Sequence, residues 1–250
     1  MSRTASLPAV SAPFEWTEAG GVVVLEARLD HARAVFSTRL GGVSEGPYRA
    51  LNLGILTDDE EERVRHNRAV LIGALRREPG SVAMGHQVHG AAVQVREHVN
   101  PREALAQVDA QATTSPALTP LVLVADCVPL ILATPGAVAA VHCGWRGLAA
   151  GIVARAVDQV RALGRGPVTA AAGPAIGPCC YEVGPEVLER FAARGPTLDL
   201  PACINTELEQ LDVAVHLAGV CVSCNPELFF SHRRDGGVTG RQAGLGWLDS

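Results

Sequence analysis

The chain has 250 residues, of which 48% are hydrophobic, and its net charge at pH 7 is −5. This length supports a large apolar core, and the acidic balance argues against a nucleic acid or an anionic membrane as the main partner. All 21 basic residues are arginine, which excludes Schiff-base, pyridoxal-phosphate and Walker A chemistry, since each needs a lysine. We expect a monomer that acts on small molecules.

The N-terminus and the cysteines predict a cytoplasmic protein. Pro8 and Pro13 stand where a secretory signal needs an unbroken apolar core, and seven cysteines, an odd number, fit a reducing compartment. The most apolar stretch, 121–145, is interrupted by polar residues and prolines and turns at Thr134-Pro135-Gly136. This pattern favours a buried hairpin over a membrane span.

The residue pattern in the first half of the chain predicts mainly short strands. After a loosely ordered segment over 1–20, we expect one domain over 21–250. Its first strands are expected at 22–29 and 34–37, followed by a Gly-rich loop. Acidic residues in the first turn indicate a helix over 60–75, capped by Thr57 or Asp58. Further strands are expected at 81–85, 91–96, 121–125, 128–133 and 137–141.

The second half adds more helix. Leu148, Ile152, Ala156 and Val160 have helical spacing and predict a helix over 147–163. The remaining expected elements are a strand at 168–172, helices over 184–194 and 203–217, and a strand at 220–223 before an Arg-rich tail. Because the strands come in runs, the expected fold class is α+β, a sandwich with mixed sheets.

Three segments place a His or Cys where an apolar strand gives way to a turn. They are Gln87-Val88-His89-Gly90, Ala125-Asp126-Cys127-Val128-Pro129 and the stretch that begins at Val141 and includes His142. Two imidazoles and one thiolate suit zinc and leave a fourth tetrahedral position open for water or substrate. The separations match no local metal motif, so spacing alone leaves a structural role for each residue open.

Seven segments, taken in chain order from about residue 20 to the C-terminus, resemble the YfiH or laccase-domain family, which includes peptidoglycan editing factors. They are FSTRLGGVSEGPYRALNLG (36–54), HQVHG (86–90), VDAQAT (108–113), ADCVPLIL (125–132), VHCGWRG (141–147), GPAIGPCCYEVG (173–184) and RRDGGVTGR (233–241). The resemblance implies a four-layer α/β/β/α sandwich and, by motif, His89, Cys127 and His142 as metal ligands. It also implies a purine nucleoside phosphorylase with adenosine deaminase and methylthioadenosine phosphorylase activities.

Four further residues are candidates for binding substrate or phosphate. Arg39 opens the Gly-rich loop and Arg146 lies near a helix start, so both could bind an anion, although loop-fastening hydrogen bonds are the alternative. Ser44 and Asn52 suit turn or cap hydrogen bonds, and their family motifs keep a substrate contact open. The tail segment that contains Arg241 is about one residue longer than the family pattern.

The other cysteines have plainer interpretations. Cys143 stands where the family has a small residue, and we expect a buried small hydrophobe rather than a metal ligand. The spacing of Cys221 and Cys224 resembles half of a four-cysteine metal site. Cys179 and Cys180 could complete it only if folding brought the pairs together, so a second structural zinc is the minor expectation.

Three other functions compete with a zinc nucleoside enzyme. A copper polyphenol oxidase is disfavoured, because multicopper oxidases use many His-x-His pairs and none occurs among these eight histidines. A thiol amidase that edits peptidoglycan precursors, with Cys127 as nucleophile and His89 or His142 as base, stays open. A zinc-stabilised binding module is disfavoured because structural zinc sites normally close all four positions.

Overall fold

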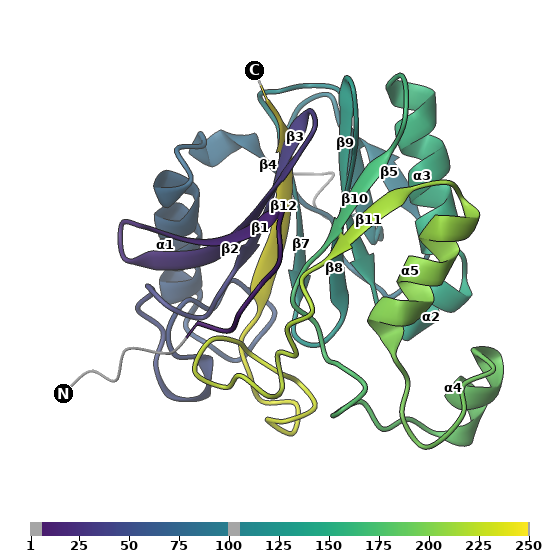
Figure 1. The fold of residues 1–250 in the computed structure, drawn as a ribbon. Helices are drawn as coiled ribbons and strands as arrows, with labels where there is room; N and C mark the ends of the chain where they lie inside the picture. The colour runs from purple at the N-terminus through teal and green to yellow at the C-terminus, as the bar shows by residue number, and fades with distance from the viewer. Residues whose placement is uncertain (1–6, 100–105, 250) are drawn as a thin grey trace.

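The computed structural model describes residues 7–99 and 106–249. Two six-stranded sheets pack face to face, with helices on both outer surfaces (Figure 1). The strands are β1 (Phe14–Ala19), β2 (Val22–Leu29), β3 (Ala32–Ser37), β4 (Val82–Ala83), β5 (Val93–Val95), β6 (Ala110–Thr113), β7 (Thr119–Val124), β8 (Val128–Thr134), β9 (Ala137–Cys143), β10 (Thr169–Ala172), β11 (Ala214–Leu217) and β12 (Gln242–Leu248).

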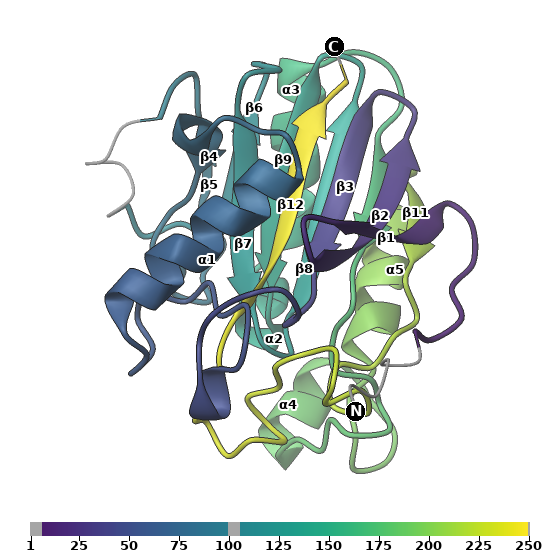
Figure 2. The ribbon, with the colours of Figure 1, turned by 90° about the vertical axis from the view of Figure 1, so that its left-hand side faces the viewer.

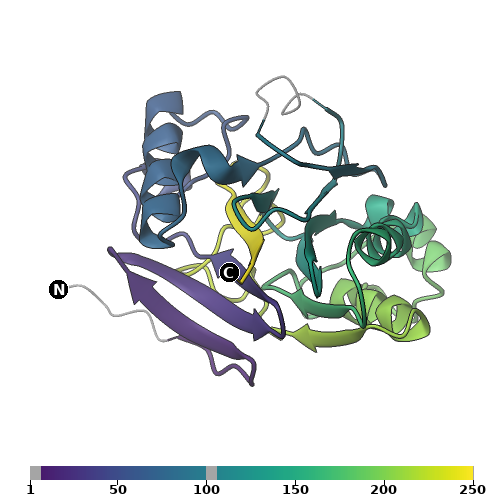
Figure 3. The same ribbon diagram turned by 90° about the horizontal axis from the view of Figure 1, so that it is seen from above.

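The helices complete a four-layer α/β/β/α sandwich, as expected. The α-helices are α1 (Glu61–Ala74), α2 (Trp145–Ala149), α3 (Ile152–Leu163), α4 (Pro185–Arg190) and α5 (Leu200–Gln210), and the 3-10 turns are η1 (Gly46–Tyr48) and η2 (Pro79–Ser81). Helix α1 covers one sheet, whereas α3 and α5 cover the other (Figures 1 and 3). None of the helices in the described ranges has the length and apolar character needed to cross a bilayer.

Both sheets are mixed. The first has the order β1-β2-β3-β12-β7-β4, and the second has the order β11-β10-β8-β9-β6-β5. The pairs β4–β7, β5–β6 and β10–β11 are parallel, whereas the other pairings are antiparallel. In Figure 2 α1 crosses in front of the first sheet, with β12 and β7 behind it.

The hairpin of β8 and β9 forms the centre of the core because both of its faces are covered. Leu130 and Leu132 pack with the helix side of the second sheet, while Ile131 and Ala133 pack between the two sheets. This alternation follows from the two-residue period of a strand. Thr134 pairs with Ala137 across the tight turn, which confirms the expected buried hairpin.

Several sequence-based boundaries were wrong. Residues 14–19 belong to β1, which pairs along its whole length with β2, although a loose segment was expected to residue 20. Residues 1–6 lie outside the described residues. Helix α1 has Glu60 at its N-cap, without a side-chain cap from Thr57 or Asp58. The helix expected over 147–163 is divided into α2 and α3 by Gly151, whose φ is +82°.

The C-terminal third differs most from expectation. Helix α5 ends at Gln210, and the chain then turns through Asp212 at φ +53° into β11, which pairs in parallel with β10. Residues 220–223 form no strand, and Cys221 makes only an isolated bridge with Ala175. The Arg-rich tail instead leads into β12, a fully buried central strand of the first sheet.

Candidate metal centre

Three potential metal ligands, distant in sequence, meet at one end of the second sheet. Cys127 lies in the turn from β7 to β8, His142 is near the end of β9, and His89 follows β4 in a loop. Because Pro129 pairs with His142 in the β8–β9 ladder, the turn before β8 lies beside the end of β9. One ligand atom from each residue lies within 4.8 Å of the others. His142 is buried, Cys127 half-buried and His89 exposed, so the group opens to solvent on the His89 side.

The backbone is held in uncommon conformations on either side of this group. His89 has φ +58° and Asp126 has φ +99°, both in the region that side chains rarely adopt. Such conformations cost on the order of 1–3 kcal/mol each and persist only where the surroundings fix them. The neighbouring contacts supply that restraint.

Asp109, just before β6, restrains both histidines. Its carboxylate accepts the backbone N–H groups of Val88 (3.2 Å), His89 (2.9 Å) and Gly90 (2.8 Å). It also lies 2.8 Å from Nδ1 of His142 and is fully buried. Because Nδ1 is occupied in this way, Nε2 of His142 is the nitrogen available to a metal, as in a carboxylate–histidine–metal arrangement.

Glycines let the three segments approach one another. A Cβ on Gly144 would lie 3.0 Å from Sγ of Cys127 and 3.0 Å from Cδ2 of His89. A Cβ on Gly147 would lie 2.8 Å from the carbonyl oxygen of Gly90. Gly144 therefore keeps the space beside Cys127 and His89 open, and Gly147 lets the loop that carries His89 approach.

The charges of the group are strongly coupled. Burial opposes the Cys127 thiolate, but the imidazoles of His142 and His89 outweigh it and lower the pKa of Cys127 to about 6. Burial likewise opposes the His142 imidazolium, but the Cys127 thiolate and Asp109 raise the pKa of His142 to about 9. The lowered pKa favours the thiolate of Cys127, the form that binds metals. A metal would replace the proton of His142.

Asp126 connects the centre to the C-terminal segment. Its carboxylate accepts the Ser231 hydroxyl (2.6 Å) and the backbone N–H of Arg233 (2.7 Å). These contacts agree with a structural role beside the ligand. Burial lowers the pKa of Arg241, while the charges of Cys127 and Asp126 raise it, so this guanidinium acts electrostatically on the centre.

The two predicted phosphate-binding arginines have different surroundings. Arg39 donates to the carbonyl oxygens of Arg49 (2.6 Å) and Pro226 (2.9 Å), and its guanidinium lies 4.4 Å from the centre of the Phe230 ring. These are loop-fastening contacts, the alternative that the sequence left open. Arg146 is exposed inside α2 rather than before it, and lies 4.3 Å from the centre of the Trp145 ring.

Ser44 and Asn52 are buried in one hydrogen-bond network. Ser44 donates to Asp59 (2.6 Å), and Asn52 donates to Thr57 (2.9 Å) and Asp59 (2.9 Å). The amide oxygen of Asn52 accepts the backbone N–H of Arg241 (2.8 Å). Asn52 also accepts the backbone N–H of Gly54 (3.0 Å), which is the turn hydrogen bond expected of it, whereas the Ser44 hydroxyl bonds to side chains distant in sequence. Neither residue joins the metal ligands.

The roles of Asp109, in the segment VDAQAT, and of Gly144, in VHCGWRG, were not predicted from the sequence. Tyr181 was also missed. Burial and then the Cys127 charge raise its pKa to about 12, while Arg233 and Arg146 lower it. Cys143, by contrast, is fully buried in the core, as expected for a small hydrophobe.

The donor set fits zinc on chemical grounds. Two imidazoles and one thiolate form a borderline-soft set, and three protein ligands leave one tetrahedral position for another molecule. The space that a Cβ on Gly144 would fill lies against two of the three ligands. The residues therefore form a group able to hold a metal ion and still open to a substrate.

The architecture and this group define an α+β protein of the YfiH type. The structure of YfiH from Bacillus licheniformis has a TM-score of 0.85 and 29% identity, with 96% of this chain and 100% of that chain covered. YlmD from Geobacillus stearothermophilus has a TM-score of 0.84 and 31% identity, with 95% and 99% covered.

The amino-acid sequence also places the chain in a protein family. Residues 33–249 match the family model described as multi-copper polyphenol oxidoreductase laccase, and the chain belongs to this family. A Streptomyces coelicolor relative named purine nucleoside phosphorylase is 39% identical over 231 residues, covering 86% of this chain and 94% of the relative. One from Deinococcus radiodurans with the same name is 39% identical over 222 residues, covering 82% and 85%. The names of these relatives support the conclusion that this chain is an enzyme.

Proposed function

We propose that this chain is a zinc-dependent purine nucleoside phosphorylase that also deaminates adenosine. The observation that carries the proposal is the convergence of His89, Cys127 and His142 around one point, with Asp109 bonded to Nδ1 of His142 and to the backbone N–H of His89. The substrate class rests on the relatives named purine nucleoside phosphorylase. We further propose that the chain from β1 to β12 forms one catalytic domain, that the protein is a monomer and, because all seven cysteines are free, that it is cytoplasmic.

Zinc is the proposed metal, held by Nε2 of His142, Sγ of Cys127 and the imidazole of His89. When bound, it supplies Lewis-acid chemistry at the open position. Asp109 keeps Nδ1 of His142 engaged, which orients that imidazole, and it holds the 88–90 backbone that carries His89.

In the phosphorolytic reaction an oxygen of inorganic phosphate forms a bond to C1′ of the nucleoside as the bond from C1′ to N9 breaks. The electron pair leaves with N9, which takes up a proton, and the products are the free base and the sugar 1-phosphate. Adenosine, inosine and methylthioadenosine share this bond. Arg146 and Arg39 are the residues proposed to bind the phosphate through their positive charge.

The surroundings support the two arginines to different degrees. Burial and the charge of Cys127 raise the pKa of Tyr181, and the charge of Arg146 lowers it. Arg146 and Cys127 therefore lie within electrostatic range of the same phenol. Burial and the charge of Arg234 lower the pKa of Arg39, Asp235 raises it, and Arg49 lowers it, so an anion here would meet two neighbouring cations besides Arg39 and one carboxylate. For Ser44 and Asn52 we propose an indirect role, since Asn52 fixes the backbone of Arg241.

In the deamination reaction the oxygen of water adds to C6 of adenine, and the amino group leaves as ammonia with the proton it needs. This reaction requires no phosphate. The two reactions therefore differ in a reagent that the experimenter controls.

A thiol amidase is the second candidate, and one observation favours it. The pKa of Cys127 is lowered to about 6 beside His142, as in thiolate–imidazolium pairs of cysteine hydrolases. The same thiolate, however, lies within 4.8 Å of two imidazoles on different segments, which is the arrangement of a metal ligand. The copper oxidase suggested by the family description is disfavoured, because neither potential metal group within the described ranges is a histidine cluster.

Product analysis with and without phosphate tests the proposal. Adenosine and inosine are each incubated with the purified protein, and the products are separated by chromatography. We expect free base and ribose 1-phosphate only with phosphate, and inosine from adenosine under both conditions. Release of free base at the same rate without phosphate would overturn the phosphorolysis, and absence of inosine from adenosine would overturn the deamination.

A further inference from the structure

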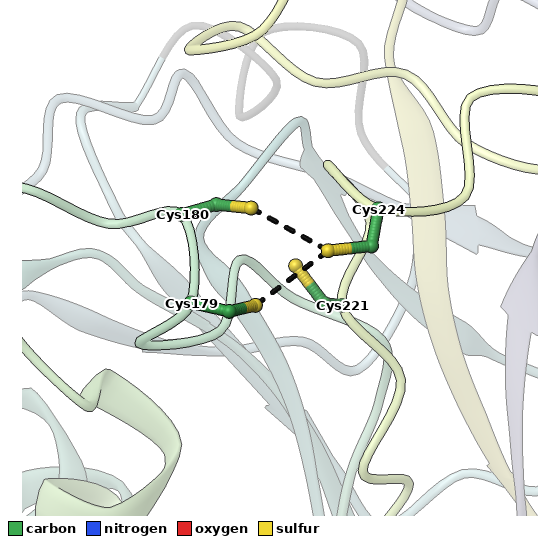
Figure 4. A group of neighbouring side chains, drawn as sticks. All are labelled: Cys179, Cys180, Cys221 and Cys224. Atoms are coloured by element: carbon green, nitrogen blue, oxygen red, sulfur yellow. Dashed lines mark hydrogen bonds between the residues drawn. The ribbon is translucent and has the colours of Figure 1, made fainter.

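A second cluster of potential metal ligands lies outside the centre described above. Cys179 and Cys180 follow β10 in the loop to α4, and Cys221 and Cys224 follow β11. Folding brings the two pairs together, and the four sulfurs lie within 4.8 Å of one another (Figure 4). The sulfur of Cys224 lies 3.6 Å from that of Cys179 and 3.5 Å from that of Cys180.

These distances match sulfurs that share one tetrahedral ion. A Zn–S bond of about 2.3 Å places two sulfurs of a tetrahedral site roughly 3.8 Å apart. A disulfide would require about 2.05 Å, and all four cysteines are free. An iron–sulfur cluster would hold the four thiolates further apart, because several iron and sulfide ions lie between them.

The backbone around the cluster is fastened independently of any sulfur. Val222 donates its N–H to the carbonyl oxygen of Ala175 (3.0 Å), and the N–H of Ala175 donates to Val220 (3.2 Å). Cys180 donates its N–H to the carbonyl oxygen of Gly177 (3.0 Å), which closes the turn that carries the first pair. The two pairs are therefore positioned before a ligand arrives.

Hydrogen bonds also favour a bound thiolate at Cys221. The backbone N–H of Gly177 donates to its sulfur (3.2 Å), a contact that stabilises negative charge on the sulfur. The amide of Asn225 donates to the carbonyl oxygen of Cys221 (2.8 Å) and holds the turn between Cys221 and Cys224. The two-residue spacing of this pair is the one that zinc sites commonly use.

We propose that Cys179, Cys180, Cys221 and Cys224 bind a structural zinc ion. Four thiolates close all four tetrahedral positions and leave none for a substrate, so this ion has a structural role. It would tie the 173–184 loop to the segment after β11. That segment is joined to the active-site side by Arg234, which donates to the carbonyl oxygen of Val222 (3.0 Å) and follows the Arg233 bound to Asp126. The proposal does not depend on the catalytic activity.

Metal content distinguishes the two sites. The full chain is purified without added metal, and zinc per chain is measured by elemental analysis together with native mass spectrometry. We expect about two zinc ions in the unmutated protein and about one in Cys221→Ser/Cys224→Ser. Cys127→Ser should also lose one ion, but from the other site. Cys203→Ser is the matched control, since Cys203 lies on α5 and belongs to neither group, and it should keep both ions.

Alkylation of the unmutated protein gives a second measurement if the double variant does not fold. Cys179 and Cys224 are exposed, so an alkylating reagent can reach their sulfurs when no metal is bound. We expect slow alkylation at all four cysteines, which becomes fast after a strong chelator is added. Fast alkylation before chelation, a disulfide within the cluster, iron or copper in place of zinc, or equal zinc in the unmutated protein and the folded double variant would each overturn the proposal.

Discussion

The metal centre and the network around Asn52 both contain polar residues of family motifs, yet their side chains are used differently. In the network each polar atom has a protein partner. Asn67 donates to Ser44, Ala50 and Asn52, and its oxygen accepts the N–H of Val43. At the centre, the ligand atoms of three segments converge on one another instead. Some motif residues make all their hydrogen bonds within the protein, and these residues hold the backbone in place. Side chains whose ligand atoms converge on one point can instead hold a metal ion.

The largest effect should come from the ligands themselves. His89→Ala, Cys127→Ser and His142→Ala each remove one of three donors, and Cys127→Ser replaces a soft thiolate with a mostly protonated hydroxyl. We expect loss of the bound zinc at this centre and of both activities to background, measured by elemental analysis and product chromatography. If Cys127→Ser loses turnover but keeps this zinc, and the unmutated protein forms a covalent substrate adduct on Cys127, the thiol nucleophile replaces the ligand assignment.

Asp109→Asn should have the next largest effect. An amide cannot accept from the three backbone N–H groups and from His142 as the carboxylate does. Removing a group that hydrogen-bonds to a metal ligand lowers metal affinity by roughly 10- to 100-fold. Competition with a coloured chelator measures the loss. Asp199→Asn, at the N-cap of α5, is the control and should leave affinity unchanged. Equal affinity in Asp109→Asn and the unmutated protein would contradict the orienting role.

Gly144→Ala should weaken metal binding less, on the order of tenfold, which is the lower end for changes around metal ligands. The new Cβ would lie 3.0 Å from Sγ of Cys127 and from Cδ2 of His89, so both must shift. Gly73→Ala places a Cβ in open space within α1 and should leave affinity unaltered. The same competition assay compares the two variants, and indistinguishable affinities would show that the space beside Gly144 is not needed.

Changes in the hydrogen-bond network around Asn52 should lower stability without weakening metal binding. Asn67→Ala leaves several buried groups without partners, each costing about 1–3 kcal/mol. We expect a lower free energy of unfolding in denaturant titrations but unchanged metal affinity in the folded protein. A large loss of metal affinity without a loss of stability would mean that the network and the centre are not separate in function.

The sequence predicted the β8–β9 hairpin well because its signals are local. Apolar and β-branched residues flank a Thr134-Pro135-Gly136 turn, and no distant contact is needed to recognise it. Strand β12 was missed because Gly244 and Gly246 weaken its pattern. A Cβ on Gly244 would lie 2.5 Å from Cβ of Pro129, so glycine is required by the opposite sheet, which only the folded structure shows.

The same distinction applies to the sites. The three candidate metal ligands could be selected from short motifs that resemble those of the family, whereas Asp109 acts only when the 88–90 loop folds over it. The four-cysteine cluster was a minor expectation because its pairs are about forty residues apart and meet through the contacts of Ala175 with the segment after β11. The helix that became α5 was expected to run to residue 217 because Leu211 and Val215 continue the apolar spacing of Ile204 and Leu208 past the turn at Asp212.

The central claim is that a zinc ion is held by His89, Cys127 and His142 in the active protein. Anomalous diffraction at the zinc absorption edge, from crystals of protein purified without added metal and shown to be active, tests it most directly. We predict a peak bonded to Sγ of Cys127 and to Nε2 of His142, with the His89 imidazole as third ligand. Active crystals with no anomalous peak between these three side chains would contradict the claim.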